Sequence, residues 1–191
     1  MGAGPAALGG LPLIFKQVHV FRDSGVLMIG DSHTLISRAH RPFEGYDVDA
    51  RSGRESAEGM NVLSRYLRPD HRVVVFDLAT NDHADPARFE SNLALLETRV
   101  GPRKLVMVNC WRQDGANSHR GVNQALACFV ARQPERASLV DWASYIDDHP
   151  GLLGQPEDWV HFSLDAYRIR AAMVNAAISS TLEGSEAGHA D

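Results

Sequence analysis

Short apolar runs alternate with helical stretches along the chain, and this alternation constrains the fold more than any other feature of the sequence. A run that is apolar at consecutive positions fits a strand buried on both faces, whereas an alternating run fits an outer strand. The runs are Val26–Ile29, the alternating Tyr46–Ala50, Arg72–Leu78, Lys104–Asn109 and Ala137–Val140. We therefore expect about five strands, most of them covered on both sides.

Segments with helical periodicity separate these runs. They are Thr34–Ala39, Ser56–Leu67, Pro86–Val100, Gly121–Gln133 and Leu164–Leu182. Asp85 and Ser163 stand directly before two of them and are residue types that cap helix N-termini. The alternation predicts an α/β fold, a three-layer α/β/α sandwich around a flavodoxin-like, doubly wound sheet of about five parallel strands. In such a sheet the functional site lies at the carboxyl ends of the strands.

The length of 191 residues is enough for one domain with a full hydrophobic core and marginal for two. We find no internal repeat and no linker, so we expect a single domain over residues 1–191. The Gly- and Ala-rich start is expected to be an N-terminal extension of about residues 1–20. The small and polar residues 182–191 predict a disordered tail.

Charge and hydropathy exclude several classes of function. A net charge of −5 gives no broad basic field for nucleic acid or anionic membrane, and the cluster Arg51, Arg54 and Arg65 is expected to be solvated. No run of 18 apolar residues and no basic leader are present, so we expect no membrane insertion. The expected location is the cytoplasm, or alternatively the soluble extracytoplasmic part of a longer membrane protein. Cys110 and Cys128 are expected to be buried free thiols.

Polar residues follow the first three strands in chain order. Gly30-Asp31-Ser32 places a serine at a strand end and a helix start, where free N–H groups and the helix dipole favour an anion. Ser32 is either a nucleophile or a helix cap. Gly53 either brings its N–H close to a ligand or only makes a turn. The Asn81 amide either donates to an oxyanion or makes a loop turn.

Asp158 and His161 stand three residues apart in the loop before the last helix. A carboxylate there can fix the imidazole tautomer so that the other ring nitrogen takes the serine proton. A serine hydroxyl is a poor nucleophile at neutral pH without such a base. Alone, an Asp-x-x-His pair is more often a surface pair or a cap, so the ordered combination with Ser32, Gly53 and Asn81 carries the hypothesis.

This ordered set resembles the SGNH hydrolase family, also called the GDSL hydrolases, over roughly residues 27–178. The resemblance implies that Ser32 is the nucleophile, His161 the base and Asp158 the residue that orients it. It also implies an oxyanion hole made of the Ser32 and Gly53 backbone N–H groups and the Asn81 amide. The reaction would pass through an acyl-serine.

Two positions depart from the family pattern. Ala79 stands where the third block usually has glycine, and one methyl there would tighten the loop or narrow the pocket. His33 stands where the first block usually has leucine. The His33 ring would either line the substrate pocket or point into solvent, and we favour solvent. Trp111, at the end of a strand, either walls the pocket or belongs to the core, and Trp142 and Trp159 are expected to pack around the last loop.

A narrower similarity connects the chain to the SGNH domains associated with bacterial cell-surface O-acyltransferases. It rests on Leu139–Trp142, His149-Pro150, Asp158–Phe162, and Val108–Arg112 with Asn123. Three functions follow as hypotheses. The first is a serine esterase that hydrolyses short, acetyl-type esters of a small molecule or a carbohydrate. The second is an acyltransferase that moves an acyl group to a sugar hydroxyl, and the third is a catalytically quiet binding module.

No cofactor or metal is expected. His33, His83 and His161 could converge, but no helical His-Glu-x-x-His spacing supports a metal site. No Gly-rich phosphate loop follows the first strand, which speaks against a dinucleotide cofactor. The sequence gives no indication of an oligomeric state.

Overall fold

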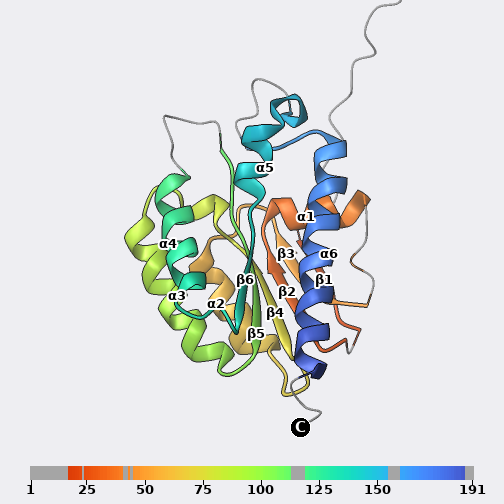
Figure 1. Ribbon diagram of the computed structural model, residues 1–191, viewed down its shortest axis with the longest axis vertical. Coiled ribbons are helices and arrows are strands. Elements are labelled where there is room, and N and C mark those ends of the chain that lie inside the picture. The colour runs from red at the N-terminus through yellow and green to blue at the C-terminus, as the bar shows by residue number, and fades with distance from the viewer. Residues whose placement is uncertain are drawn as a thin grey trace, which may run out of the picture.

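The structure is a computed structural model that describes residues 17–22, 24–40, 43, 45–112, 119–154 and 160–187. The described residues form a six-stranded sheet with helices on both faces (Figure 1). The strand order is β1-β3-β2-β4-β5-β6, with β1 antiparallel to β3 and the other neighbours parallel. Their bounds are β1 Gln17–Val20, β2 Val26–Gly30, β3 Asp47–Arg51, β4 Val73–Asp77, β5 Lys104–Val108 and β6 Ala137–Val140. The predicted α/β sandwich is confirmed, and the five parallel strands follow the flavodoxin-like order.

Two helices cover one face of the sheet and three cover the other (Figure 1). The first pair is α1 (Ser32–His40) and α6 (Leu164–Ala187), and the other three are α2 (Ser56–Tyr66), α3 (Pro86–Val100) and α4 (Arg120–Ala131). A further short helix, α5 (Trp142–Asp148), follows directly after β6, at the carboxyl end of the sheet. Two 3₁₀ turns are η1 (Thr80–Asp82) and η2 (Pro150–Leu152).

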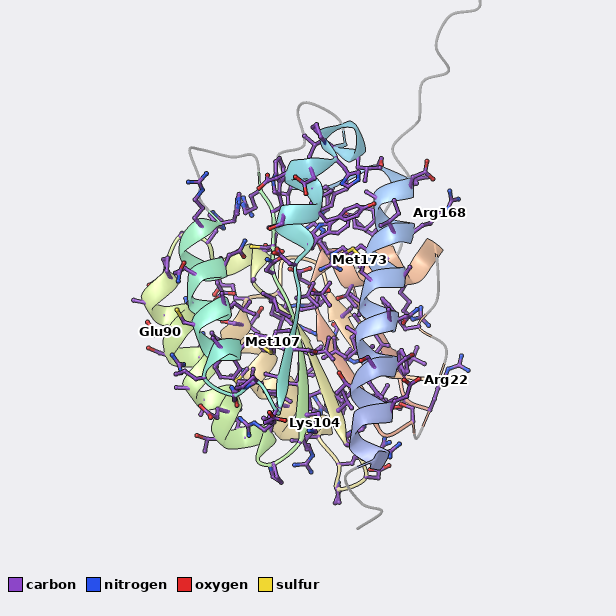
Figure 2. All side chains as sticks on the ribbon, in the orientation of Figure 1. Arg22, Glu90, Lys104, Met107, Arg168 and Met173 are labelled. Atoms are coloured by element: carbon purple, nitrogen blue, oxygen red, sulfur yellow. The ribbon has the colours of Figure 1, made fainter. Side chains whose placement is uncertain are left out.

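Strand β2 shows how the sheet divides the core into two. All five of its residues are buried, because a central parallel strand is covered on both faces. Val26 and Met28 pack into the core beneath α1 and α6, whereas Leu27 and Ile29 pack into the core beneath α2, α3 and α4. In β5, Figure 2 shows Met107 inside the molecule, and this side chain is fully buried.

The edge strand β1 corrects the expected extension at residues 1–20. Residues 17–20 pair with β3, so β3 is not the outer strand of the sheet. Every second residue of β1 is half-buried and the others are exposed, which is the pattern of an edge strand with one covered face. Four residues of alternation are too short a signal to distinguish a strand from irregular chain. Residues 1–16 lie outside the described part of the chain.

The ends of the helices agree with most of the expected caps. The Asp85 side chain accepts a hydrogen bond from the Arg88 N–H, and the Ser163 hydroxyl accepts one from the Ala166 N–H. The helix α6 continues to Ala187, past the expected start of a disordered tail, and Leu182 packs against the core. Residues 188–191 are not described. The sequence patterns did not indicate α5, because seven residues give little periodicity.

Two smaller expectations can be compared with the structure. Cys110 is a buried free thiol as expected, but Cys128 is an exposed one, because it lies on the solvent side of α4. Among the described residues, no helix is both long and apolar enough to cross a bilayer.

Candidate active site

The predicted site residues lie in four segments that gather at one edge of the sheet. Ser32 is the first residue of α1, directly after β2, and Gly53 follows β3. Asn81 lies in the turn η1 after β4, and His161 lies in the loop before α6. Because parallel strands end at the same edge, β2, β3 and β4 bring three of these loops together, and α6 returns the fourth to the same place (Figure 1).

Ser32 and His161 form the centre of this site. The Ser32 Oγ lies 3.1 Å from the His161 Nε2, although 129 residues separate them in the chain. Ser32 is 5% exposed, and the His161 ring is half-buried. This is hydrogen-bond reach for a hydroxyl and a base that takes its proton. Ser32 also begins a helix, whose first N–H groups have no partner within the helix.

The Asn81 amide contacts the segment between β2 and α1 and the loop after β3. Its Nδ2 donates to the Arg54 backbone oxygen at 3.0 Å and, over a longer distance of 3.4 Å, to the Asp31 Oδ2. Gly53 has a φ of +70°, a conformation that favours glycine, and a side chain there would meet no atom within 4 Å. Gly53 is therefore required by its turn, and whether its N–H also binds an oxyanion stays a prediction.

Arg54 corrects the expectation of a solvated basic cluster, since only 2% of it is exposed. Its Nη1 donates to the backbone oxygens of Gly30 at 3.2 Å and Asp49 at 2.8 Å. Its Nη2 pairs with the Asp49 carboxylate. Arg54 thereby ties the loop of Gly53 to the end of β2. Its charge is paired inside the fold because a buried β3 carboxylate is in reach, which local charge counting does not reveal.

Asp82 performs a similar task between two loops. Its Oδ1 accepts from the Ser56 hydroxyl at 2.6 Å, and its Oδ2 accepts from the Ser56 N–H at 2.8 Å. Ser56 begins α2, so Asp82 caps that helix from the neighbouring loop. The loops of Asn81 and Gly53 are thus fixed to each other by an aspartate that the sequence analysis did not single out.

A buried charged cluster lies next to Ser32, and the sequence analysis did not single it out either. The Arg170 guanidinium of α6 makes two bonds to Asp77, of 2.9 Å and 2.5 Å, and Thr34 donates to the same carboxylate. Asp31 is fully buried nearby and accepts from the His33 N–H at 2.8 Å. Burial and then the negative charge of Asp77 raise the pKa of Asp31 to about 7. Each of these charges lies on a different element, which explains why no local pattern indicates the cluster.

His33 does not point into solvent, so the favoured expectation for it is wrong. Only 2% of the residue is exposed, and its Nδ1 lies 3.1 Å from the Tyr167 hydroxyl. The ring lies beside His161, with centroids 5.6 Å apart, and beside Phe162. Burial, followed by the charge of Arg170, holds the pKa of His33 well below its usual range. His33 is therefore a neutral, buried ring beside His161, because the first turn of α1 packs against α6.

Asp158 and Trp159 lie outside the described residues, so the proposed orientation of His161 by Asp158 stays a prediction. Ala79, the other departure from the family pattern, is 1% exposed and packs into the core beneath α2, α3 and α4. Its methyl group therefore points into the interior, and its φ of −88° is open to any residue.

Trp111 is half-buried at the end of β5. Its indole N–H donates to Asp147 at 2.6 Å, and its ring stacks on His119. It also packs partly against the core, which supports the expected core role, and its role as a pocket wall stays a prediction. Trp142 is buried and meets the Phe162 ring edge-on, as expected for a residue packed around the last loop.

The remaining candidates have local structural partners. Asn123 holds the Cys110 backbone through two hydrogen bonds, of 3.1 Å and 2.7 Å. His83 lies 3.2 Å from the Thr80 oxygen. Within the described ranges, no group of three or more His, Cys, Asp or Glu side chains could hold a metal ion.

Comparison with known proteins gives matches among solved structures. No family model and no curated protein sequence matches the chain. The C-terminal catalytic domain of peptidoglycan O-acetyltransferase A from Streptococcus pneumoniae has a TM-score of 0.67 at 18% identity, over 85% of this chain and 94% of that one. A GDSL-like lipase from Bacteroides thetaiotaomicron gives 0.64 at 15% identity, over 83% and 89%.

An acetylxylan esterase from Geobacillus stearothermophilus is also similar, with a TM-score of 0.56 at 15% identity, over 78% of this chain and 90% of that one. The likeness to all three extends over most of each chain, so it concerns the whole architecture. At these identities it is a likeness of fold.

Proposed function

From the SGNH hydrolase fold of this chain, we propose that it is a serine esterase that removes short, acetyl-type groups from a carbohydrate ester. The observation that carries the proposal is the 3.1 Å distance between the Ser32 Oγ and the His161 Nε2. A serine that only caps its helix has no need of a base at this distance. Two proteins of similar fold support the acetyl and carbohydrate parts of the proposal: a peptidoglycan O-acetyltransferase and an acetylxylan esterase.

The proposed reaction has two halves. His161 takes the proton of Ser32 as the Oγ attacks the ester carbonyl, and the tetrahedral intermediate collapses when the protonated His161 gives that proton to the leaving alcohol. In the second half, His161 takes a proton from water. The resulting attack on the acyl-serine releases the acid and restores the Ser32 hydroxyl. In this proposal Asp158 orients His161 throughout.

The oxyanion would be bound by the Ser32 N–H at the start of α1, the Gly53 N–H and the Asn81 amide. Asn81 has two amide hydrogens, and in the resting site they are directed at Arg54 O and Asp31 Oδ2. The bond to Asp31 is the longer, at 3.4 Å, and is the weaker of the two. We infer that the developing oxyanion takes over this hydrogen, which makes the interaction stronger in the transition state than in the ground state.

A second candidate is an acyltransferase that uses the same serine. The likeness to the peptidoglycan O-acetyltransferase domain favours it, and so does the similarity of the late loop noted in the sequence. The two functions differ in whether water or a sugar hydroxyl reaches the acyl-serine. A catalytically quiet binding module is the third candidate, and the paired Ser32 and His161 argue against it. For either enzyme, a cytoplasmic location and an extracytoplasmic one stay open proposals.

A series of p-nitrophenyl esters from acetate to octanoate, run with and without a chitooligosaccharide or xylooligosaccharide acceptor, tests the proposal. We expect fastest release from the acetate, no dependence on acceptor, and no release by the Ser32→Ala variant. Acylated sugar identified by mass spectrometry would favour the transferase. Turnover by Ser32→Ala equal to that of the unsubstituted protein would contradict both enzymatic proposals.

A further inference from the structure

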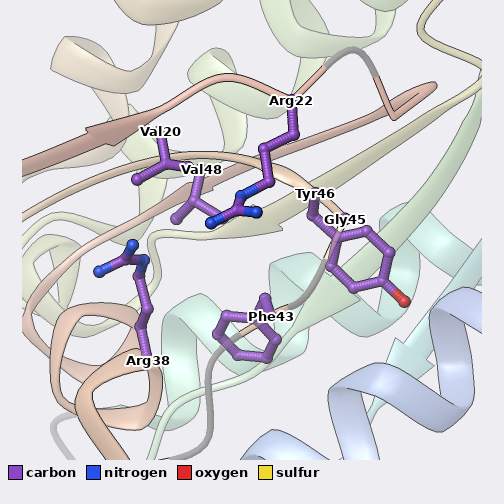
Figure 3. Close-up of a pocket in the computed structure, with 7 residues that line it drawn as sticks. All are labelled: Val20, Arg22, Arg38, Phe43, Gly45, Tyr46 and Val48. Carbon is purple, nitrogen blue, oxygen red and sulfur yellow. The ribbon is translucent and has the colours of Figure 1, made fainter.

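A cavity of about 400 Å³ lies away from the catalytic pair, where β1, β3 and α1 meet. Figure 3 shows the seven described residues that line it: Val20, Arg22, Arg38, Phe43, Gly45, Tyr46 and Val48. Val48 is at the amino end of β3, whereas the catalytic residues gather at the carboxyl ends of the strands. Arg38 lies six residues after Ser32 on α1, which is about 9 Å along a helix. The cavity is therefore separate from the site of Ser32.

The cavity holds two positive charges. Figure 3 shows the guanidinium ends of Arg22 and Arg38 both directed toward the space between them. Neither makes an ion pair with a residue in the described part of the chain, and none of the described lining residues is acidic. Arg22 is exposed and Arg38 is half-buried, so a solute can reach both. Two guanidinium groups without an acidic partner among the described residues are a local excess of positive charge in a chain of net charge −5.

Among the described residues, the acid directly next to the cavity in sequence, Asp47, does not neutralise these arginines. Asp47 is fully buried, and its Oδ2 lies 2.8 Å from both His71 Nε2 and Arg68 Nη2. Its other oxygen accepts the Arg22 backbone N–H. Because side chains alternate along a strand, Asp47 and Val48 face opposite sides of β3, and only Val48 borders the cavity.

Aromatic and aliphatic groups form the remaining walls. Phe43 is 4% exposed, and Val20 and Val48 close the strand side. Tyr46 is half-buried, and burial raises the pKa of its phenol, so the ring is neutral at pH 7 and does not repel an anion. A hollow of this size, with polar and apolar walls in similar measure, is large enough for a small molecule. Guanidinium groups recognise carboxylate and phosphate through paired N–H donors.

From these observations we propose that the cavity binds a small organic anion, a carboxylate or phosphate joined to an aromatic or similarly apolar body. The anionic end lies between Arg22 and Arg38, and the apolar body lies against Phe43 and Tyr46. This site is independent of the ester chemistry at Ser32, and its test requires no turnover.

Isothermal titration calorimetry at low ionic strength tests the proposal with four probes: phenyl phosphate, benzoate, inorganic phosphate and benzyl alcohol. We expect saturable binding of the two aromatic anions, weaker binding of inorganic phosphate, and none of benzyl alcohol. Phenyl phosphate binding more tightly than benzoate would assign the natural ligand to the phosphates, and the reverse order would assign it to the carboxylates. Absence of saturable binding by either aromatic anion would overturn the proposal.

Substitutions locate the binding. Arg22→Gln and Arg38→Gln should each lower the affinity for the more tightly bound aromatic anion by at least about tenfold, since each removes one of two charges. Arg132→Gln, an exposed arginine at the end of α4, is the matched control and should bind as the unsubstituted protein does. Ser32→Ala should also bind unchanged. If both cavity variants bound the probe as tightly as the unsubstituted protein does, or if Ser32→Ala lost binding, the probe would bind elsewhere and the proposal would be overturned.

Discussion

At the scale of single residues, Ser32 is the proposed nucleophile, and we expect its removal to have the clearest consequence. Ser32→Ala deletes the nucleophile without opening a large cavity, so we expect acetyl-ester hydrolysis to fall between about 10⁴-fold and 10⁶-fold with the thermal midpoint nearly unchanged. Ser91→Ala is the control, since the Ser91 hydroxyl bonds only within its own helix and is exposed. Rates can be followed by p-nitrophenol release and folding by circular dichroism. Turnover that survives in the first variant would return Ser32 to the role of a helix cap.

Asn81 is the residue at which ground-state and transition-state roles can be separated. If its amide binds the oxyanion, Asn81→Ala should remove about 2.7–4 kcal/mol of transition-state stabilisation. The loss should appear in kcat with KM nearly constant, because the interaction forms only in the transition state. Steady-state kinetics on the acetate ester measure both constants. A change confined to KM, or none at all, would leave Asn81 as a residue that only connects Asp31 to Arg54.

Asp31 should leave a signature in the pH dependence of stability. Its pKa is raised from 3.8 to about 7, chiefly by burial, so between those values the folded protein keeps a proton that the unfolded chain has released. The stabilising contribution is full below about pH 4 and is lost as pH rises through about 7. Relative to Asp31→Asn, the free energy of unfolding should therefore fall on the order of a few kcal/mol between pH 4 and 8.

Urea denaturation at several pH values measures this difference. Asp165→Asn, at an exposed position on α6, serves as the control and should give a profile parallel to that of the unsubstituted protein. The same parallel profile for Asp31→Asn would show that Asp31 titrates alike in the folded and unfolded chains.

At the scale of elements, two aspartates cap neighbouring helices but differ in what else they hold. Asp82 caps α2 from the loop of Asn81, whereas Asp85 caps α3 within its own segment. Either change to alanine should cost about 0.5–2 kcal/mol of stability. Only Asp82→Ala should also lower kcat, because it releases the loop of Gly53 from that of Asn81. Thermal unfolding and ester kinetics on both variants test this, and equal kcat values would contradict the coupling.

The sequence predicted the elements whose signal is local and missed those that depend on partners. The apolar strands and the caps Asp85 and Ser163 were predictable because period and cap chemistry are encoded within a few residues. The convergence of Ser32 and His161 was predictable because the fold class fixes where strands end. Strand β1 was missed because four residues carry too little pattern. His33 was misjudged because its burial depends on Tyr167, 134 residues away.

At the scale of the whole molecule, one buried ion pair connects helix α6, which follows the loop of His161, to β4, which lies next to the strand that precedes Ser32. Arg170 of α6 and Asp77 at the end of β4 are 1% and 2% exposed, and they bond through two N–H donors. The helix α6 begins three residues after His161, so its position on the sheet fixes where the loop that carries His161 ends. We therefore expect the pair to influence the distance between His161 and Ser32 as well as stability.

Removal of one charge of the Arg170–Asp77 pair should lower the free energy of unfolding more than removal of both charges. Arg170→Met leaves the Asp77 charge buried and uncompensated, so we expect a loss of about 3–5 kcal/mol in the free energy of unfolding. Adding Asp77→Asn removes that charge, and the double variant should recover much of the stability while Thr34 keeps an acceptor. Urea denaturation of the unsubstituted protein, the two single variants and the double variant completes a double-mutant cycle. Additive losses would mean that Arg170 and Asp77 act independently.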